Sequence, residues 1–341
     1  MQPPPKSTTR TPGKAPGVIG WLLLAPMVLW LLAFVVAPTA ILVVASFTHP
    51  DDDTRLPVYR QPPPETGEPA IGTFTTENYR RIVVDDEGRF LKTEEEDITA
   101  RNADGEEEVV GTRKVTRLAA PWLRVFAWSV FYAALTTVLC IAISYPVAWF
   151  IGRAREGTRN LLLMLVMIPF WTSFLIRTYA WVTILATEGL LNGLLLYTKA
   201  ISEPFGMLYT PGAVVLGLVY SYLPFMILPI FGSVEKLDNS LVEAALDLGA
   251  GPVRAFRKVI LPLTRPGVIA GVMLVFVPAV GMFAISSLMG GGQSPMIGDV
   301  IQQQFTGQGR NWPFGSALGM ALVAMFLIAF VATARLRSSR T

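Results

Sequence analysis

This chain of 341 residues has one cysteine, one histidine and few charged residues, which make up only 16% of it. The lone Cys140 and the lone His49 offer no disulfide or metal-binding framework. No Gly-x-x-x-x-Gly-Lys-Ser/Thr loop for phosphate binding is present either, since Lys14 follows only Pro-Gly. We therefore expect no metal, no bound cofactor and no enzymatic activity, ATP hydrolysis included, from this chain by itself.

Apolar residues dominate instead: the chain is 52% hydrophobic. Six runs are long enough to span a bilayer, and they cover residues 17–47, 125–150, 161–187, 213–234, 267–289 and 314–333. The predicted fold is all-α, a polytopic integral membrane protein with six transmembrane helices. The first run has the alternative of a cleaved signal peptide, but a signal's apolar region is far shorter, so we expect it to remain as a helix.

Basic residues predict the orientation. Fourteen lysines and arginines fall in the segments 1–16, 151–160, 235–266 and 334–341, against only Lys199 and Arg310 in the two short loops on the other side. The positive-inside rule then places both termini in the cytoplasm. Anionic membrane lipid and topology account for these basic charges, so no nucleic-acid partner is required.

The long connection 48–121 is predicted to lie outside the cytoplasm. It holds seventeen acidic and ten basic residues, a net charge of −7 within a chain of net charge +3. Such a segment either concentrates a cation or steers a basic partner, or it is simply a solvated loop. Within it, alternation over 97–111 favours a small hairpin. Residues 1–16 are predicted to be disordered, and 190–205 to form a short interfacial helix on the outer side.

Two short helices are predicted between the fourth and fifth runs. Ser240 and Glu243 have the spacing of a capping box at a helix start, and Gly249 suits the left-handed turn that stops this helix. Pro252 fits the first turn of a second helix, and Pro262 is expected to end it. Residues 243–262 follow the spacing Glu-Ala-Ala, three residues, Gly, nine residues, apolar residue, any residue, Leu-Pro.

This loop resembles the cytoplasmic signature loop of ATP-binding cassette (ABC) importer permeases, with Val259 standing where isoleucine is usual. The resemblance implies that the first short helix is a coupling helix seated in a groove of the ATPase subunit. The positions it assigns to ATPase coupling are Glu243, Ala244, Ala245, Gly249, Val259, Leu261 and Pro262. The alternative is an ordinary amphipathic hairpin packed on its own protein.

Aromatic residues in the predicted spans, with two acidic residues near their outer ends, are the candidates for a substrate path. Aromatic faces can guide a cation, although such residues also serve as membrane anchors or core, and surface carboxylates are commonly just solvated. The candidates are Trp171, Tyr179, Trp181, Glu188, Tyr220, Tyr222, Phe283, Asp299 and Trp312. Arg177 is the clear ionisable residue inside a span, expected in the outer leaflet.

Three further stretches resemble spermidine/putrescine permeases of the first-subunit type: 168–179, then 223–226 with 235–238, and then 288–291 with 297–301 and 311–315. That resemblance implies an ABC type-1 permease domain over 122–338 in a bacterial inner membrane. It also implies four kinds of partner: two ATPase subunits that bind ATP and magnesium, a second homologous permease, an extracytoplasmic solute-binding protein, and membrane lipid. The alternatives are an ABC permease for another small solute, a membrane assembly factor, and a stand-alone secondary transporter. The last would more naturally show several midplane acids or inverted repeats.

Overall fold

The computed structural model describes residues 18–50, 57–58, 74–84, 91–101, 107–118, 121–307 and 310–338. The predicted disorder of 1–16 falls outside these residues. Six described helices are long and apolar enough to cross a membrane, which confirms the all-α prediction and the number of spans. They are Leu24–Ser46, Pro121–Arg153, Phe174–Tyr197, Pro211–Glu235, Pro252–Val280 and Trp312–Val331.

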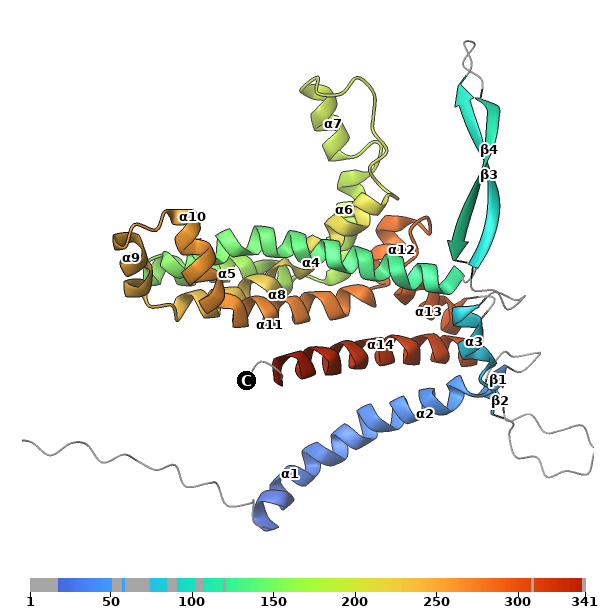
Figure 1. Ribbon diagram of the computed structural model, residues 1–341, viewed down its shortest axis with the longest axis horizontal. Coiled ribbons are helices and arrows are strands. Elements are labelled where there is room, and N and C mark those ends of the chain that lie inside the picture. The colour runs from blue at the N-terminus through green and yellow to red at the C-terminus, as the bar shows by residue number, and fades with distance from the viewer. Residues whose placement is uncertain are drawn as a thin grey trace, which may run out of the picture.

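Three long helices form the packed core, and they run side by side in Figure 1: α4 (Pro121–Arg153), α8 (Pro211–Glu235) and α11 (Leu261–Val280). Side chains such as Met226 and Ile230 of α8 are fully buried between them. Close approach depends on a small residue, because a Cβ on Gly267 of α11 would lie 2.4 Å from the carbonyl oxygen of Pro229. Small residues at such contacts are how membrane helices pack without a hydrophobic driving force.

The first run is helical from Val18 to Ser46, as α1 (Val18–Leu31), the π-turn η1 (Leu32–Val36) and α2 (Ala37–Ser46). α2 packs beside α14 (Trp312–Ser338), whereas α1 diverges from it (Figure 1). The short helix α3 (Glu77–Val83) fastens the end of α2, because the buried Asn78 side chain donates to the carbonyls of Ser46 and Thr48, each at 3.0 Å.

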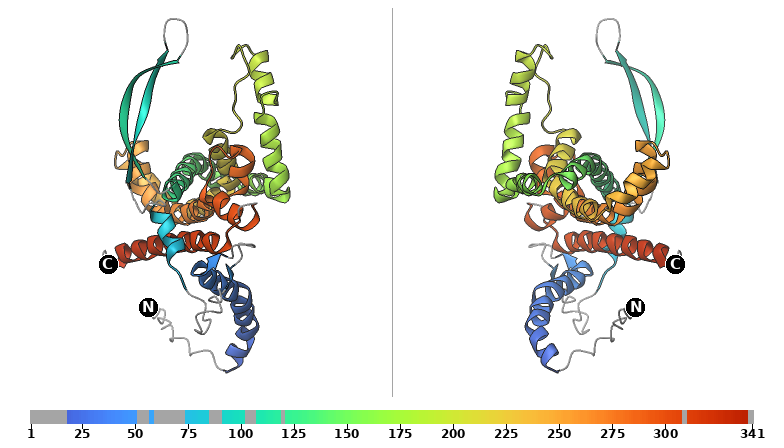
Figure 2. Two further views of the ribbon diagram at one scale, coloured as in Figure 1. Left: turned by 90° about the vertical axis from the view of Figure 1, so that its right-hand side faces the viewer. Right: turned by 90° about the vertical axis from the view of Figure 1, so that its left-hand side faces the viewer.

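The third run departs from the prediction of one helix over 161–187. It is broken into α5 (Glu156–Met167), the 3₁₀ turn η2 (Ile168–Trp171) and α6 (Phe174–Leu185). The break lies at Pro169, the second residue of the 3₁₀ turn, and Thr172 after the turn is extended. As a result α6 rises out of the helix layer, on the side of the bundle opposite α14 (Figures 1 and 2).

Beyond α6, the helix predicted over 190–205 is present only as α7 (Leu190–Tyr197). The rest is a loop held by Asn192, whose amide group bonds to the backbone N–H and carbonyl of Phe205.

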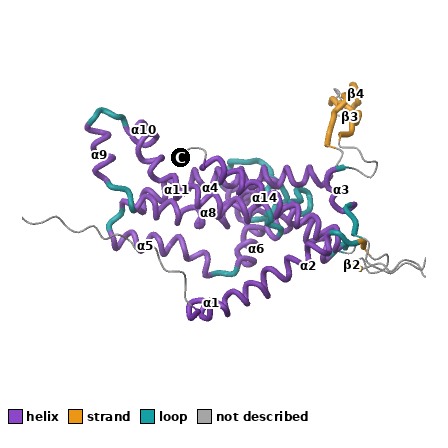
Figure 3. Tube along the Cα trace, turned by 60° about the horizontal axis from the view of Figure 1, so that its bottom comes forward, coloured by secondary structure: helices purple, strands orange, loops and turns teal. Residues whose placement is uncertain are grey.

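The connection 48–121 contains the hairpin that the alternating residues predicted, and the hairpin is longer than expected. Strands β3 (Leu91–Arg101) and β4 (Glu107–Leu118) pair antiparallel, with an irregularity at Ile98/Thr99. A second, two-residue pair joins β1 (His49–Pro50) to β2 (Pro57–Val58). Figure 3 shows the hairpin standing at the same end of the bundle as α3.

The two ends of the bundle carry different short elements. At one end lie α9 (Asn239–Asp247), α10 (Pro252–Ala255) and the π-turn η3 (Phe256–Ile260). At the other lie α3, α12 (Ala284–Gly290) and α13 (Ile297–Thr306) (Figure 1). The predicted topology makes the α9–α10 end cytoplasmic and the α12–α13 end extracytoplasmic.

Candidate coupling loop and translocation path

The N-cap of helix α9 lies two residues earlier than the sequence suggested. The cap is Asp238, whose carboxylate accepts a hydrogen bond from the Ser240 N–H at 2.9 Å. The predicted capping box of Ser240 and Glu243 is therefore wrong: Ser240 already lies inside the helix and donates its N–H to Asp238. That hydrogen bond also lowers the pKa of the Asp238 carboxyl, because it favours the charged form.

The end of α9 is a complete Schellman motif, as expected for a glycine stop. The Ala250 N–H donates to the Ala245 carbonyl at 3.0 Å, and the Gly249 N–H donates to Leu246 at 2.9 Å. Gly249 has φ +79°, and nothing lies within 4 Å of where its Cβ would be. Backbone conformation rather than crowding therefore requires glycine here.

The second helix does not end at Pro262. α10, η3 and α11 follow one another directly, and the Leu261 N–H bonds to the carbonyl of Phe256, five residues back. A π-turn just before Pro262 provides room for a ring that a regular α-helix interior would reject. Val259, Leu261 and Pro262 thus belong to a continuous rod that joins the loop to the fifth span.

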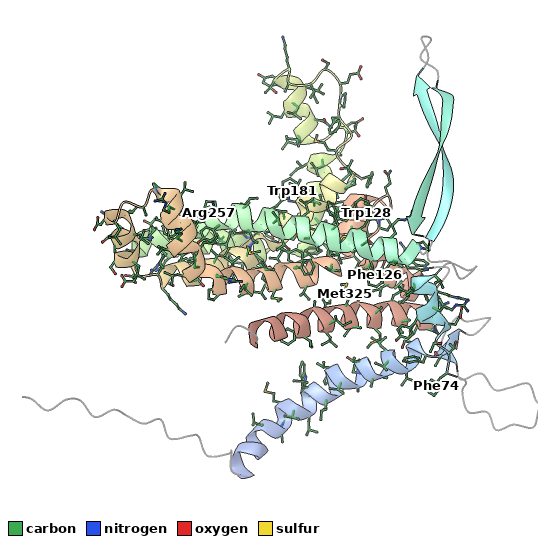
Figure 4. All side chains as sticks on the ribbon, viewed as in Figure 1. Phe74, Phe126, Trp128, Trp181, Arg257 and Met325 are labelled. Carbon is green, nitrogen blue, oxygen red and sulfur yellow. The ribbon has the colours of Figure 1, made fainter. Side chains whose placement is uncertain are left out.

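Two of the three signature residues of α9 are exposed, and the third, Ala245, is half-buried. Glu243 and Ala244 are exposed, and the neighbouring Leu248 is 88% exposed. Leu241, Leu246 and Val253 of the same loop are exposed as well, and several exposed apolar side chains on one short segment favour a surface that a partner covers. Beside it is a hollow lined by Gly249, Gly251, Pro252, Val253, Arg254, Arg257 and Lys258. Figure 4 places Arg257 at this end of the bundle.

The rod is tied to α4 by a polar joint. The hydroxyls of Tyr145 and Thr264 are 2.6 Å apart, and the Tyr145 ring lies edge-on to Phe256 with ring centres 5.1 Å apart. Thr264 in turn donates to the carbonyl of Ile260 at 2.9 Å. Movement of the π-turn is thereby linked to α4 through buried groups.

Some of the predicted path residues come together between α6, η2 and α8. Trp181 packs edge-on to Tyr220, with ring centres 5.5 Å apart, where α6 leaves the bundle (Figure 4). Tyr222 lies against Phe225, which packs on Phe170 at 5.0 Å. Sequence reasoning missed Phe170 and Phe225. The only signal in the sequence was proximity to predicted path residues, because Phe170 directly precedes Trp171 and Phe225 is three residues after Tyr222. We call this group the aromatic seam: Phe170, Trp181, Tyr220, Tyr222 and Phe225.

Other predicted path residues lie apart from the seam. Trp171 and Tyr179 are 76% and 55% exposed, and Phe283 is also exposed. Trp312 packs on Phe305 of α13, with ring centres 5.6 Å apart. Glu188 is exposed on the turn between α6 and α7.

Asp299 is not a solvated surface carboxylate, which corrects the simpler of the two sequence interpretations. It is 4% exposed and accepts hydrogen bonds from the Ser286 hydroxyl and, at 2.9 Å, from the Met296 N–H. Burial raises the pKa of this carboxyl, while the two hydrogen bonds oppose the shift. The residue joins the start of α13 to α12, and its Oδ1 is buried without a partner among the described residues.

The described residues contain no cluster of three or more His, Cys, Asp or Glu that could hold a metal ion. What they provide is a membrane-spanning bundle with an exposed helical loop at one end and an aromatic seam within it. This combination is that of an integral membrane transport subunit.

The chain belongs to the family described as binding-protein-dependent transport system inner membrane component, which it matches over residues 118–338. It is a multi-pass inner membrane protein.

Curated relatives share this region. The chain is 43% identical over 229 residues to the spermidine/putrescine transport system permease protein PotB of Escherichia coli, covering 66% of this chain and 83% of that protein. It is 46% identical over 218 residues to PotB of Haemophilus influenzae, covering 63% and 76%. The inner membrane ABC transporter permease protein YdcU of Escherichia coli is 34% identical over 214 residues, covering 58% and 67%.

Among solved structures, the fold is similar to a bacterial ABC transporter involved in import of the acidic polysaccharide alginate. The TM-score is 0.60 at 15% identity, covering 93% of this chain and 96% of that one. This likeness concerns the fold alone.

Proposed function

We propose that this chain is a permease subunit of an ATP-driven importer for polyamines such as spermidine and putrescine. The observation that carries the proposal is the exposed, Schellman-terminated helix α9 at one end of the spans, together with the PotB relatives. The aromatic seam suits such a substrate, because ring faces attract ammonium groups without the cost of burying a carboxylate.

In this proposal the complex contains a second homologous permease, two ATPase subunits that bind ATP and magnesium, and an extracytoplasmic solute-binding protein. Both termini and α9 lie in the cytoplasm, where α9 inserts into the ATPase. Closure of the ATPases on ATP moves α9. The continuous rod from α10 through α11, tied to α4 by Tyr145, carries that movement into the spans. Lipid surrounds the outer surface of the bundle.

The test is reconstitution of the complete complex with its binding protein in nanodiscs. ATP hydrolysis should be stimulated by spermidine or putrescine and should be absent when the ATPase subunits are omitted. Stimulation only by an anion or a neutral sugar would contradict the polyamine assignment and leave the permease assignment standing.

A further inference from the structure

Arg177 lies on α6 without an anionic partner in the described part of the chain. Its Nε is buried and makes no hydrogen bond there, and its guanidinium carbon lies 5.4 Å from the centre of the Phe170 ring. The ion pairs of the described residues join Arg80 and Arg81 to Glu77, and Arg159 to Glu235, and Arg177 takes part in none of them. Ionisable side chains within membrane spans are rare, face the interior of a bundle or a water-filled cavity, and pair with one another or with backbone carbonyls.

The depth of Arg177 can be judged from the ring that it covers. Phe170 packs on Phe225, which is the fifteenth residue of the 25-residue helix α8. At 1.5 Å per residue, Phe225 is roughly 21 Å along a helix of roughly 37 Å. Arg177 is therefore near the middle of the bundle rather than in the outer leaflet, because the break at η2 turns α6 away from the direction of α5. A lipid phosphate at the bilayer surface is not within reach of this depth.

The same helix has an apolar face that nothing in the described chain covers. Leu175, Ile176 and Tyr179 share that face, and Ile176 is 67% exposed. Both side views show α6 and α7 rising on the side of the core opposite α14 (Figure 2). Arg177 lies at the edge of this face, between it and the aromatic seam.

We infer that this α6 face is the seat of the second permease subunit, and that an aspartate or glutamate of that subunit pairs with Arg177. Charge complementarity selects the occupant: a half-buried guanidinium with a buried, unpaired Nε, far from the lipid headgroups, needs an anion supplied by protein. A polyamine cannot supply it, since a second cation would be repelled. An intersubunit carboxylate would also neutralise Arg177 beside the aromatic seam, which a bare guanidinium would make unfavourable for an incoming cation. The inference rests on the proposed function for the existence of the second permease.

The first experiment locates the contact. A benzophenone amino acid is placed at Ile176 or at Tyr179 in the complete complex, with Ile328 as the control. Ile328 is 70% exposed on α14, on the opposite side of the core. Adducts with the second permease should be at least tenfold more abundant from α6 than from α14. Equal yields, or adducts with lipid only, would overturn the inference.

The second experiment tests the charge. Arg177→Met should reduce the second permease that co-purifies with this chain by at least fivefold, whereas Arg155→Met, at an exposed arginine outside the spans, should not. Arg177→Glu should also reduce the second permease that co-purifies. Replacing one intramembrane acid of the second permease by arginine should then restore co-purification. Normal assembly of Arg177→Met, or failure of every such swap to rescue Arg177→Glu, would contradict the ion pair.

Neither experiment uses a polyamine, so a complex that imports another solute would leave this inference intact. Absence of any second permease from the wild-type complex would instead refute the proposed partner itself.

Discussion

The Tyr145 hydroxyl of α4 lies 2.6 Å from the Thr264 hydroxyl of α11, and both groups are buried. Because Thr264 donates its only proton to the carbonyl of Ile260, Tyr145 is the donor of the bond between them. This places a directed hydrogen bond between the core of the bundle and the first turn after the π-turn η3. The joint is positioned to pass movement of α9 to α4.

Replacing Tyr145 by Phe should weaken the joint while retaining the ring contact with Phe256. Loss of one buried hydrogen bond costs about 0.5–1.5 kcal/mol, so the midpoint of thermal unfolding in detergent should fall by a few degrees. The number of substrate molecules imported per ATP should also fall. Tyr132→Phe, on the same helix at a tyrosine that also packs against aromatic rings, is the control. Equal coupling ratios for the two variants would contradict the joint.

Gly249→Val should abolish transport and leave membrane insertion intact. A β-branched residue at φ +79° is strongly disfavoured, with a left-handed conformation costing about 1–2 kcal/mol per residue. The end of α9 would therefore rearrange at the surface proposed to meet the ATPase. Uptake and co-purification of the ATPase subunits measure the effect.

The matched control for Gly249 is Gly251→Ala in the same loop. Gly251 has φ −63°, and its Cβ would meet nothing within 4 Å, so alanine fits there without strain. Normal uptake by Gly249→Val, together with normal ATPase assembly, would show that this turn is not part of the coupling surface.

The sequence predicted the number of spans and the helix stop at Gly249, because these depend on local composition and backbone preference. The break of the third run was not visible in hydropathy, since 161–187 as a whole is apolar enough to be taken for one span. The interruption comes from the local backbone at Pro169 and at the extended Thr172. The cap at Asp238 was missed because Ser240 offered an equally good local pattern. Pro262 was misread because a π-turn can accommodate a proline that ordinarily ends a helix.

The candidate path residues were less predictable, because which of them lie together depends on packing between helices distant in sequence. Trp181 and Tyr220 are 39 residues apart and share a contact, whereas Trp171, beside the seam in sequence, is largely exposed. Asp299 shows the same limit. Its burial is created by α12 and by the loop that contains Ser294, and no local pattern near residue 299 encodes that environment.

Asp299 should make stability depend on pH. Its pKa is raised from 3.8 by burial, so the folded state holds the proton more tightly than the unfolded state. The associated stability is fully present below about pH 3.8 and is lost as the pH rises through the raised native value. Asp299→Asn, neutral at every pH, should remove this dependence and be no less stable than wild type at pH 8.

Thermal unfolding of the two proteins between pH 4 and pH 8 checks this expectation. Asp299→Ala should be less stable by about 1 kcal/mol, because the start of α13 loses its acceptor. Glu188→Gln, the same change of charge at an exposed site, is the control and should not alter the pH profile. If Asp299→Asn instead raises the half-saturating polyamine concentration and Glu188→Gln does not, the carboxylate belongs to the substrate path.

Removing the β3–β4 hairpin should slow uptake at low ionic strength. The segment 91–118 carries eight acidic and five basic residues, and it belongs to the acidic connection 48–121, which is predicted to lie outside the cytoplasm. A field of this sign speeds the approach of cations or of a basic protein face, and salt screens it within about 10 Å at 0.1 M. Spermidine uptake with limiting binding protein should therefore fall at 20 mM salt and approach the wild-type rate at 300 mM.

Leu91 pairs with Leu118, so the two ends of the hairpin lie opposite each other. Residues 91–118 can therefore be removed and replaced by two glycines. A deletion of 85–114, by contrast, would leave 115–118 without the partner strand. The matched variant keeps the hairpin and converts Glu94, Glu95, Glu96 and Asp97 to amides. It should reproduce most of the low-salt loss if charge is the cause. If the deletion slows uptake equally at both salt concentrations and the amide variant does not, the hairpin acts by direct contact. If uptake is unchanged in both variants, the hairpin is only a solvated loop.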